Sequence, residues 1–311
     1  MTFEQCATAF IAGHEAGWRN GKHRQQWTNT LKTYAYPVFG KLPVAAVDTG
    51  LVMKVLQPIW SAKAETAGRV RGRIERVLDW AKVQGYRDGE NPARLRGHLD
   101  NLLPKKSKVH KVKHHAALPY CDVNTFMASL RNETSISAHA LALLILTATR
   151  TSETLEATWD EISLDERVWI IPAERMKADK AHRVPLTKPV VAILQEMAEI
   201  RSGNFVFAGA KQGRPLSNMT LAMLMRRMGY GHFTPHGFRS SFRDWAAEQT
   251  SFPREVAEMA LAHKIPSPVE AAYRRGDLFE KRRKLMEAWA AYCGISLAAS
   301  KVVPFRARIP I

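Results

Sequence analysis

Two cationic side chains stand three positions apart in the stretch TPHGFRSSFRDWAAE, whose apolar spacing is typical of an amphipathic helix. On such a helix His236 and Arg239 share one face, about one turn apart. The chain adds four more residues that can bind an anion, transfer a proton or attack: Arg150, Lys177, His263 and Tyr273. A phenol with a pKa of about 10 is ionised to only about one part in a thousand at neutral pH, so an attacking tyrosine needs cationic neighbours or a base. This set would supply cationic neighbours to Tyr273 if that residue attacks.

Helices and a hairpin are expected to position these residues. A short helix at Asp122–Ser129 and an apolar helix at Ile136–Ala148 precede Arg150, and Glu153 follows it closely. The segments VWIIPA and RVPL are rich in apolar β-branched residues and flank the polar run ERMKADKAH. This pattern predicts an antiparallel hairpin with Lys177 in its connection. NFVFA predicts one more short strand, and almost all of the chain after it predicts helix.

The part of the chain before residue 104 is expected to be helical. Turn segments such as YPVFGKLPV and GYRDGENP separate four or five predicted helices. Their ranges are Phe3–Ala16, His23–Tyr36, Asp48–Trp60, Ala62–Val83 and Asn91–Asn101. In the fourth of them Arg69, Arg73 and Arg76 recur at helical spacing, opposite an apolar set. The net charge favours phosphate contact by this face, and a solvated face is the alternative.

A lysine-rich segment divides the chain. LPKKSKVHKVKHHAALP contains no acidic residue, and like charges at this density keep a segment extended. Its lysines, which are expected to lie along DNA phosphates, are Lys105, Lys106, Lys108, Lys111 and Lys113. We therefore expect a helical domain at 1–103, a basic linker at 104–117, a second domain at 118–294 and a tail at 295–311. The predicted fold class is mainly α with a small antiparallel β-sheet, that is, α+β in the second domain.

The charge balance indicates the kind of partner. The 311 residues include 46 Lys+Arg and 29 Asp+Glu, a net charge of +17. Such a field attracts polyanions, of which nucleic acid is the commonest. Three widely spaced cysteines offer no disulfide framework and fit a reducing cytoplasm. No apolar run approaches the roughly 20 residues of a membrane helix, and no signal peptide begins the chain.

A metal site is not expected. The histidines of the linker, His110, His114 and His115, lack cysteine or carboxylate companions and stand among lysines, which repel cations. No Walker-type nucleotide motif occurs in the chain either.

The ordered set of Arg, Lys, His-x-x-Arg, His and Tyr resembles that of the tyrosine recombinases, or phage integrases. The segments LAHK and AAYRRGDLFEKRRKLMEAWAAY are similar to those of prophage- and genomic-island-type integrases of bacteria. The resemblance covers about Leu118–Gly294 well and the helical N-terminal part more weakly. It implies a helical core-type DNA-binding domain followed by a tyrosine-recombinase catalytic domain. Such integrases usually begin with a separate arm-binding domain, which is absent here or was removed.

The resemblance also implies the central reaction. Arg150 and Arg239 clamp the non-bridging oxygens of the scissile phosphate, which planar guanidinium groups fit well. Tyr273 attacks the phosphorus, releases a 5′-hydroxyl and leaves a 3′-phosphotyrosyl bond. Fixed donors meet the charge on the phosphoryl oxygens, so no metal is needed. The phosphotyrosyl ester conserves the bond energy, so no ATP and no other cofactor is expected.

The remaining residues of the set receive supporting roles from the same resemblance. Lys177 protonates the leaving oxygen, and Lys180 on the same hairpin is the alternative. His236 and His263 hydrogen-bond the phosphate or assist proton transfer, and Glu153 orients its neighbours. The family commonly has glycine just before the first arginine, where TATR has alanine, so the local backbone geometry is an open question.

The function implied is site-specific recombination that integrates or excises a mobile element. The implied partners are duplex DNA at attachment core sites, a homotetramer during strand exchange and an accessory DNA-bending protein, in the bacterial cytoplasm and at the nucleoid. A type IB topoisomerase is the nearest enzymatic alternative, and a catalytically silent DNA-binding regulator of the same fold is the other. The complete polar set, with Tyr273, favours the recombinase.

Overall fold

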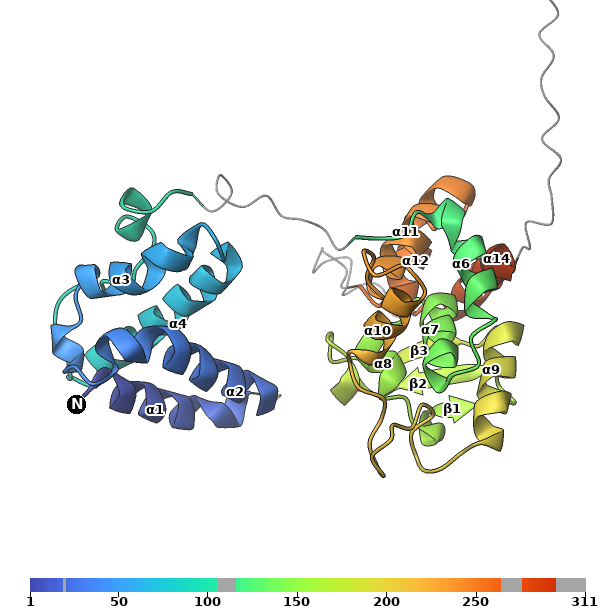
Figure 1. Cartoon of the computed structure of the whole chain (residues 1–311), viewed down its shortest axis with the longest axis horizontal. Coiled ribbons are helices and arrows are strands. Elements are labelled where there is room, and N and C mark those ends of the chain that lie inside the picture. The colour runs from blue at the N-terminus through green and yellow to red at the C-terminus, as the bar shows by residue number, and fades with distance from the viewer. Residues whose placement is uncertain (19–20, 106–115, 264–275, 295–311) are drawn as a thin grey trace, which may run out of the picture. The chain divides into compact units, whose positions relative to one another are not determined.

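A computed structural model of the chain describes residues 1–18, 21–105, 116–263 and 276–294. The chain divides into two compact units, Met1–Lys113 and His114–Ile311, each described here by itself (Figure 1). The domain boundaries predicted from the sequence stay predictions, because most of the linker and all of the tail lie outside the described residues.

The first unit is helical in its described residues. Its elements are α1 (Phe3–His14), η1 (Glu15–Gly17), α2 (Gly21–Thr30), the π-helix η2 (Leu31–Gly40), η3 (Val44–Ala46), α3 (Thr49–Trp60), α4 (Ala64–Val83) and η4 (Leu99–Asn101). Side-chain caps begin two of them: the Thr2 hydroxyl accepts from the Gln5 N–H, and the Asp48 carboxylate accepts from the Leu51 N–H. The long helix α4 packs against α1, α3 and η2, and its apolar face forms the centre of the core.

One predicted helix of this unit is wrong. The segment Asn91–Asn101 contains only the short turn η4. The Asn91 amide donates to the Glu75 carbonyl at 2.8 Å and to Asp79 at 2.6 Å, while its oxygen accepts from the Ala93 N–H. These bonds hold the segment against α4 in an irregular path, and Gly97 takes a left-handed φ of 71°.

The second unit combines helices with one small sheet in its described residues. Its helices are α6 (Val123–Leu130), α7 (Ile136–Thr147), α8 (Thr151–Leu155), α9 (Lys188–Glu199), α10 (Thr220–Arg227), α11 (Gly237–Gln249), α12 (Arg254–Ala260) and α14 (Phe279–Gly294), and its short turns are η5 (Tyr120–Asp122), η6 (Trp159–Glu161) and η7 (Ala173–Arg175). The apolar helix α7 packs against α6, α8, α9, α10 and α14, so it forms the middle of the core (Figure 1). The fold class predicted from the sequence is confirmed.

The sheet is antiparallel, in the order β1-β2-β3. The strands are β1 (Ile162–Ser163), β2 (Val168–Ile171) and β3 (His182–Pro185), and the register pairs Val168 with Pro185 and Ile171 with His182. The predicted hairpin is therefore present, with residues 172–181 as its connection. The predicted strand NFVFA is wrong: Phe205 and Ala208 form only single-residue bridges, because their partners Thr158 and Pro215 lie in irregular segments.

Candidate active site

Two helices of the second unit end in the same kind of turn. The helix α7 is followed by Ala148, with φ 52° and ψ 28°, and α12 is followed two residues later by Ala262, with φ 48°. A left-handed residue ends a helix and leaves its last carbonyl groups without partners inside the helix. These carbonyls stand at the negative end of each helix dipole, so they are favourable acceptors for cationic donors.

Arg239 of α11 donates hydrogen bonds to carbonyl groups at both turns. Its Nη1 donates to the Ala148 carbonyl, and its Nη2 donates to the Leu261 carbonyl at 2.5 Å. The side chain is only 5% exposed, and burial, followed by the charge of Arg150, lowers the pKa of Arg239 to about 10. The structure therefore holds this cation in a desolvated place with neutral acceptors.

Arg150 lies beside it at the start of α8. The Glu153 carboxylate accepts the Arg150 backbone N–H at 2.8 Å and Nη1 at 2.5 Å, and Arg150 Nη2 donates to the Ala262 carbonyl at 3.3 Å. Glu153 is 3% exposed. Both oxygens of one buried carboxylate thus fix the backbone and the guanidinium of Arg150, as expected for a residue that orients its neighbours.

His263 lies beside the two arginines and contacts Arg239. Its Nε2 is 3.3 Å from Arg239 Nη2, and its Nδ1 is 2.6 Å from Glu258 Oε2. A guanidinium only donates, so Nε2 accepts and the proton on Nδ1 is donated to Glu258. Burial raises the pKa of Glu258, but the hydrogen bond from His263 and the charge of Arg243 outweigh it, so the pKa is lowered on balance. The carboxylate is thereby kept ionised and fixes the orientation of the imidazole.

His236 and Arg239 do not share an environment. His236 is exposed at the residue before α11, and Arg239 turns into the core one turn later. The first residue of α11 must be glycine, because a Cβ on Gly237 would lie 2.5 Å from the Ala116 carbonyl oxygen. Ala116, near the start of the second unit, thus packs against the start of α11, next to His236.

Lys177 and Lys180 are both exposed in the hairpin connection. The connection is held at its start, where Met176 is buried and Arg175 binds the carbonyl groups of α8. Both lysines therefore remain candidates for the proton donor.

His182, at the other end of this connection, is a partly buried residue that the sequence analysis did not select. Burial, followed by the charge of Arg282, lowers the pKa of His182 to about 4; the charge of Arg239 also lowers this pKa, whereas the charge of Glu153 raises it. The imidazole is therefore neutral and close to the arginine pair. Its alternation with Val184, buried on the same strand, is the signal that could have found it.

Tyr273 lies outside the described residues, as do Lys106, Lys108, Lys111 and Lys113. The next described residues begin at 276. Asp277 caps α14, because its carboxylate accepts a hydrogen bond from the Phe279 N–H at 3.2 Å. Arg282, 1% exposed, donates to Asp277 and to the Arg183 carbonyl of β3. The start of α14, six residues after Tyr273 in the sequence, is thus tied to the hairpin strand.

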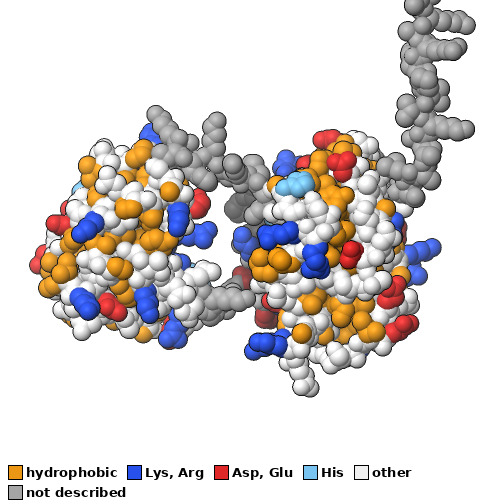
Figure 2. Space-filling view, in the orientation of Figure 1, with side chains coloured by type: hydrophobic (Ala, Val, Ile, Leu, Met, Phe, Trp, Pro, Cys, Tyr) orange, Lys and Arg blue, Asp and Glu red, His pale blue; other side chains and the backbone are white. Residues whose placement is uncertain are grey.

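The arginine face predicted on α4 needs one correction. Arg69 and Arg76 are exposed, but Arg73 is buried: it donates to the Gln26 carbonyl at 2.5 Å and lies 5.3 Å from the centre of the Trp27 ring. Spacing alone placed Arg73 with the other two, yet it points toward α2. Figure 2 shows Lys and Arg side chains on the visible face of this unit. Phosphate contact stays a prediction for Arg69, Arg76 and the exposed Lys105.

Neither a metal-binding cluster nor a membrane-spanning helix occurs among the described residues. No group of three or more His, Cys, Asp or Glu side chains there could hold a metal ion, and the predicted linker histidines lie outside those residues. No helix in the described ranges is long and apolar enough to cross a bilayer.

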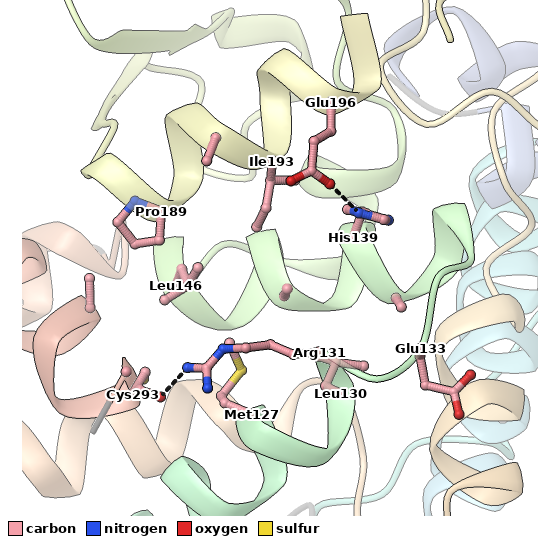
Figure 3. Close-up of a pocket in the computed structure, with 15 residues that line it drawn as sticks. Met127, Leu130, Arg131, Glu133, His139, Leu146, Pro189, Ile193, Glu196 and Cys293 are labelled. Atoms are coloured by element: carbon pink, nitrogen blue, oxygen red, sulfur yellow. Dashed lines mark hydrogen bonds and ion pairs between the residues drawn. The ribbon is translucent and has the colours of Figure 1, made fainter. Parts of the chain in front are cut away.

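A pocket of about 310 Å³ lies away from the arginine pair, between α6, α7, α9 and the end of α14 (Figure 3). His139 binds Glu196 at 2.8 Å on one side, and Arg131 donates to the Cys293 carbonyl at 3.2 Å on the other. None of the residues predicted to act on DNA lines this pocket.

Comparisons with known proteins show which families this chain matches. The family described as "Phage integrase family" matches residues 118–278, and "Phage integrase central domain" matches residues 3–98. The "Prophage integrase IntZ" of Escherichia coli K12 is 30% identical over 292 residues, which cover 93% of this chain and 70% of that protein. The "Prophage integrase IntA" of the same organism is 32% identical over 266 residues, which cover 84% of this chain and 62% of that protein.

A solved structure supports the fold. The lambda integrase fragment 75–356, a dimer bound to a COC′ core site, is similar with a TM-score of 0.66 at 17% identity, and the match covers 85% of this chain and 96% of that one. A helical unit and an α+β unit, the second with Arg150 beside the buried Arg239, fit the tyrosine recombinase class. The chain belongs to the phage integrase family.

Proposed function

We propose that this chain is a site-specific DNA recombinase, an integrase that cuts and rejoins DNA strands through a 3′-phosphotyrosyl intermediate and thereby integrates or excises a mobile element. The observation that carries the proposal is the convergence of Arg150 and Arg239 on the turns at Ala148 and Leu261–Ala262. Four of the residues predicted from the sequence meet there, although they come from three separate segments of the chain: Arg150, Glu153, Arg239 and His263.

The arginine pair suits a phosphodiester. A phosphate bound there would be met by two guanidinium groups and by His263, and its negative charge would offset the cost of burying Arg239. As the attack proceeds, charge grows on the non-bridging oxygens, and fixed donors stabilise this charge without a metal ion. Glu153 and Glu258 hold the donors in place.

The chemical step needs a nucleophile and an acid. The Tyr273 oxygen forms a bond to phosphorus while the bond from phosphorus to the 5′ oxygen breaks. Lys177 gives the leaving oxygen a proton, and the phenolic proton passes to a histidine or to solvent. Rejoining is the same step in reverse, with a 5′-hydroxyl of the other strand as the nucleophile.

The partners follow from the reaction. Strand exchange joins two duplexes, which have four strands to cut, so four subunits act together on DNA. Arg69, Arg76 and Lys105 would contact the phosphates of core-type sites, and the four further linker lysines would do the same. An accessory DNA-bending protein is a further proposed partner, and the bacterial cytoplasm, at the nucleoid, is the proposed place of action.

Covalent trapping tests the proposal. The direct repeats that flank the mobile element supply the core sequence for a nicked suicide duplex, and a denaturing gel then detects protein bound to DNA. We expect a covalent complex with the natural chain and none with Tyr273→Phe, which loses only the attacking oxygen and should bind DNA equally well. A covalent complex with the Phe variant would move the nucleophile to another residue.

The same reagents separate the alternatives. A type IB topoisomerase would relax supercoiled DNA of any sequence and act as a monomer, whereas the recombinase requires two core sites and forms recombinant products. A silent regulator would bind the core duplex and trap no DNA.

A further inference from the structure

The general acid of the proposed reaction is on an exposed loop, yet proton transfer requires a fixed donor. Lys177 is exposed in the hairpin connection and lies two residues after Arg175, the last residue of η7. Whatever fixes Arg175 therefore fixes the start of the segment that carries the lysine.

Arg175 connects the hairpin to α8, the helix that begins just after Arg150. Its Nη2 donates to the Glu153 carbonyl at 2.6 Å and to the Ser152 carbonyl at 3.5 Å, both in α8. The carboxylate of the same Glu153 holds Arg150. A continuous path of contacts thus runs from the hairpin, through the backbone of one residue, to the phosphate clamp.

Glu161 orients Arg175 from the other side. Both carboxylate oxygens of Glu161 accept from Arg175 Nη1, and one of them also accepts from Trp169 Nε1 at 2.8 Å. Glu161 is 7% exposed and Trp169 is 1% exposed, so this set is fixed in the core of the sheet. A guanidinium can bind a carboxylate and carbonyl groups at once in a fixed plane, which a lysine cannot do.

We propose that Arg175 is a positioning residue that, oriented by Glu161, fixes Lys177 relative to the phosphate held by Arg150 and Arg239. The inference rests on the proposed function, in which Lys177 protonates the leaving 5′ oxygen. It predicts that loss of Arg175 harms one step only, the transfer of that proton.

Sulfur at the scissile position makes this step measurable. In DNA with a 5′-bridging sulfur, the bond from phosphorus to sulfur breaks and a thiolate leaves without needing a proton. A variant that lacks the acid, or holds it badly, is slow on ordinary DNA and recovers on the sulfur substrate. A variant with a damaged fold or clamp is slow on both.

The experiment compares single-turnover cleavage of nicked oxygen and sulfur duplexes by full-length variants with matched DNA affinity and thermal melts. A misplacement of about 1 Å can cost about 10²-fold in rate, so we expect Arg175→Gln to be slower on oxygen DNA by about that factor and to recover most of it on sulfur DNA. Arg131→Gln, which removes another arginine-to-carbonyl bond of this unit, is the matched control and should cleave both substrates normally. Adding Arg175→Gln to Lys177→Ala should slow cleavage no further, because both act on one step.

The outcomes are separable. An equal defect of Arg175→Gln on both substrates, or no defect at all, overturns the positioning role. If the sulfur substrate restores cleavage by Lys180→Ala but not by Lys177→Ala, Lys177 is not the acid. The proposal that Arg175 positions Lys177 is then overturned as well. If Arg175→Gln does not fold, Glu161→Gln decides: it keeps the volume but weakens the orienting pair, so it must show a smaller, sulfur-rescued defect.

Discussion

Replacing Ala148, the residue just after α7, by glycine should cost the protein far less stability than the same change inside α7. A left-handed conformation costs an L-residue roughly 1–2 kcal/mol, and glycine removes this cost. Against that, Ala148 is 1% exposed, so the lost methyl group costs about 0.8 kcal/mol. The greater freedom of glycine in the unfolded chain costs about 0.4–1 kcal/mol more. The three effects nearly cancel.

Ala140 is the matched control, because it is also fully buried but lies in the middle of α7. Ala140→Gly loses the same methyl group and gains the same unfolded-state freedom without relief of strain. The two variants should differ by the left-handed strain alone, about 1–2 kcal/mol, or about 2–8 °C in the Tm of this unit. Calorimetry of the full chain, following one transition in both variants, measures the difference. Equal destabilisation by the two changes would refute the strained geometry at Ala148.

Two further predictions concern the conditions of the reaction. Cleavage should proceed at its full rate in excess EDTA without nucleotide, at constant ionic strength, because fixed donors rather than a metal ion stabilise the phosphoryl charge; loss of cleavage that Mg²⁺ specifically restores would contradict this. The pKa of His182 lies at about 4 in the fold against 6.5 ordinarily, so its contribution to stability is complete above pH 6.5 and is lost, by about 3 kcal/mol in all, as the pH falls to about 4. Urea unfolding should therefore show a steeper acid loss for the natural chain than for His182→Gln, and parallel curves would exclude the effect.

The sequence predicted what depends on local pattern. A continuous apolar run predicted α7, helical spacing of arginines opposite an apolar set predicted α4, and β-branched runs around a polar connection predicted the hairpin of β2 and β3. The order of polar residues along the chain led to the family, which the comparisons show. The structure then brings Arg150, Glu153, Arg239 and His263 together, while their roles in the reaction stay predictions.

What the sequence could not predict depends on partners distant along the chain. Arg73 has the spacing of a surface residue, but backbone and ring partners in α2 bury it. The segment after Asn91 looks helical, but one amide ties it to α4 instead. Arg175 is held by carbonyl groups more than twenty positions away, and backbone acceptors leave no mark in a sequence.

The backbone geometry at Ala148, two residues before Arg150, was left open by the sequence, because related chains commonly have glycine there. The turn that glycine commonly makes in the family is made here by Ala148 in the left-handed region, so the carbonyl still reaches Arg239. Its counterpart at Ala262 presents a carbonyl to Arg150 in the same way. Neutral carbonyls fix the position of Arg239 without cancelling its charge, whereas Glu153 pairs directly with Arg150. Most of the unbalanced positive charge of the pair thus belongs to Arg239, and the negative charge of a phosphodiester bound as proposed would offset the desolvation that lowers the pKa of Arg239. The left-handed turns at Ala148 and Ala262 therefore present the carbonyl groups that hold the two arginines, and in the proposed reaction a phosphate would supply the missing counter-charge.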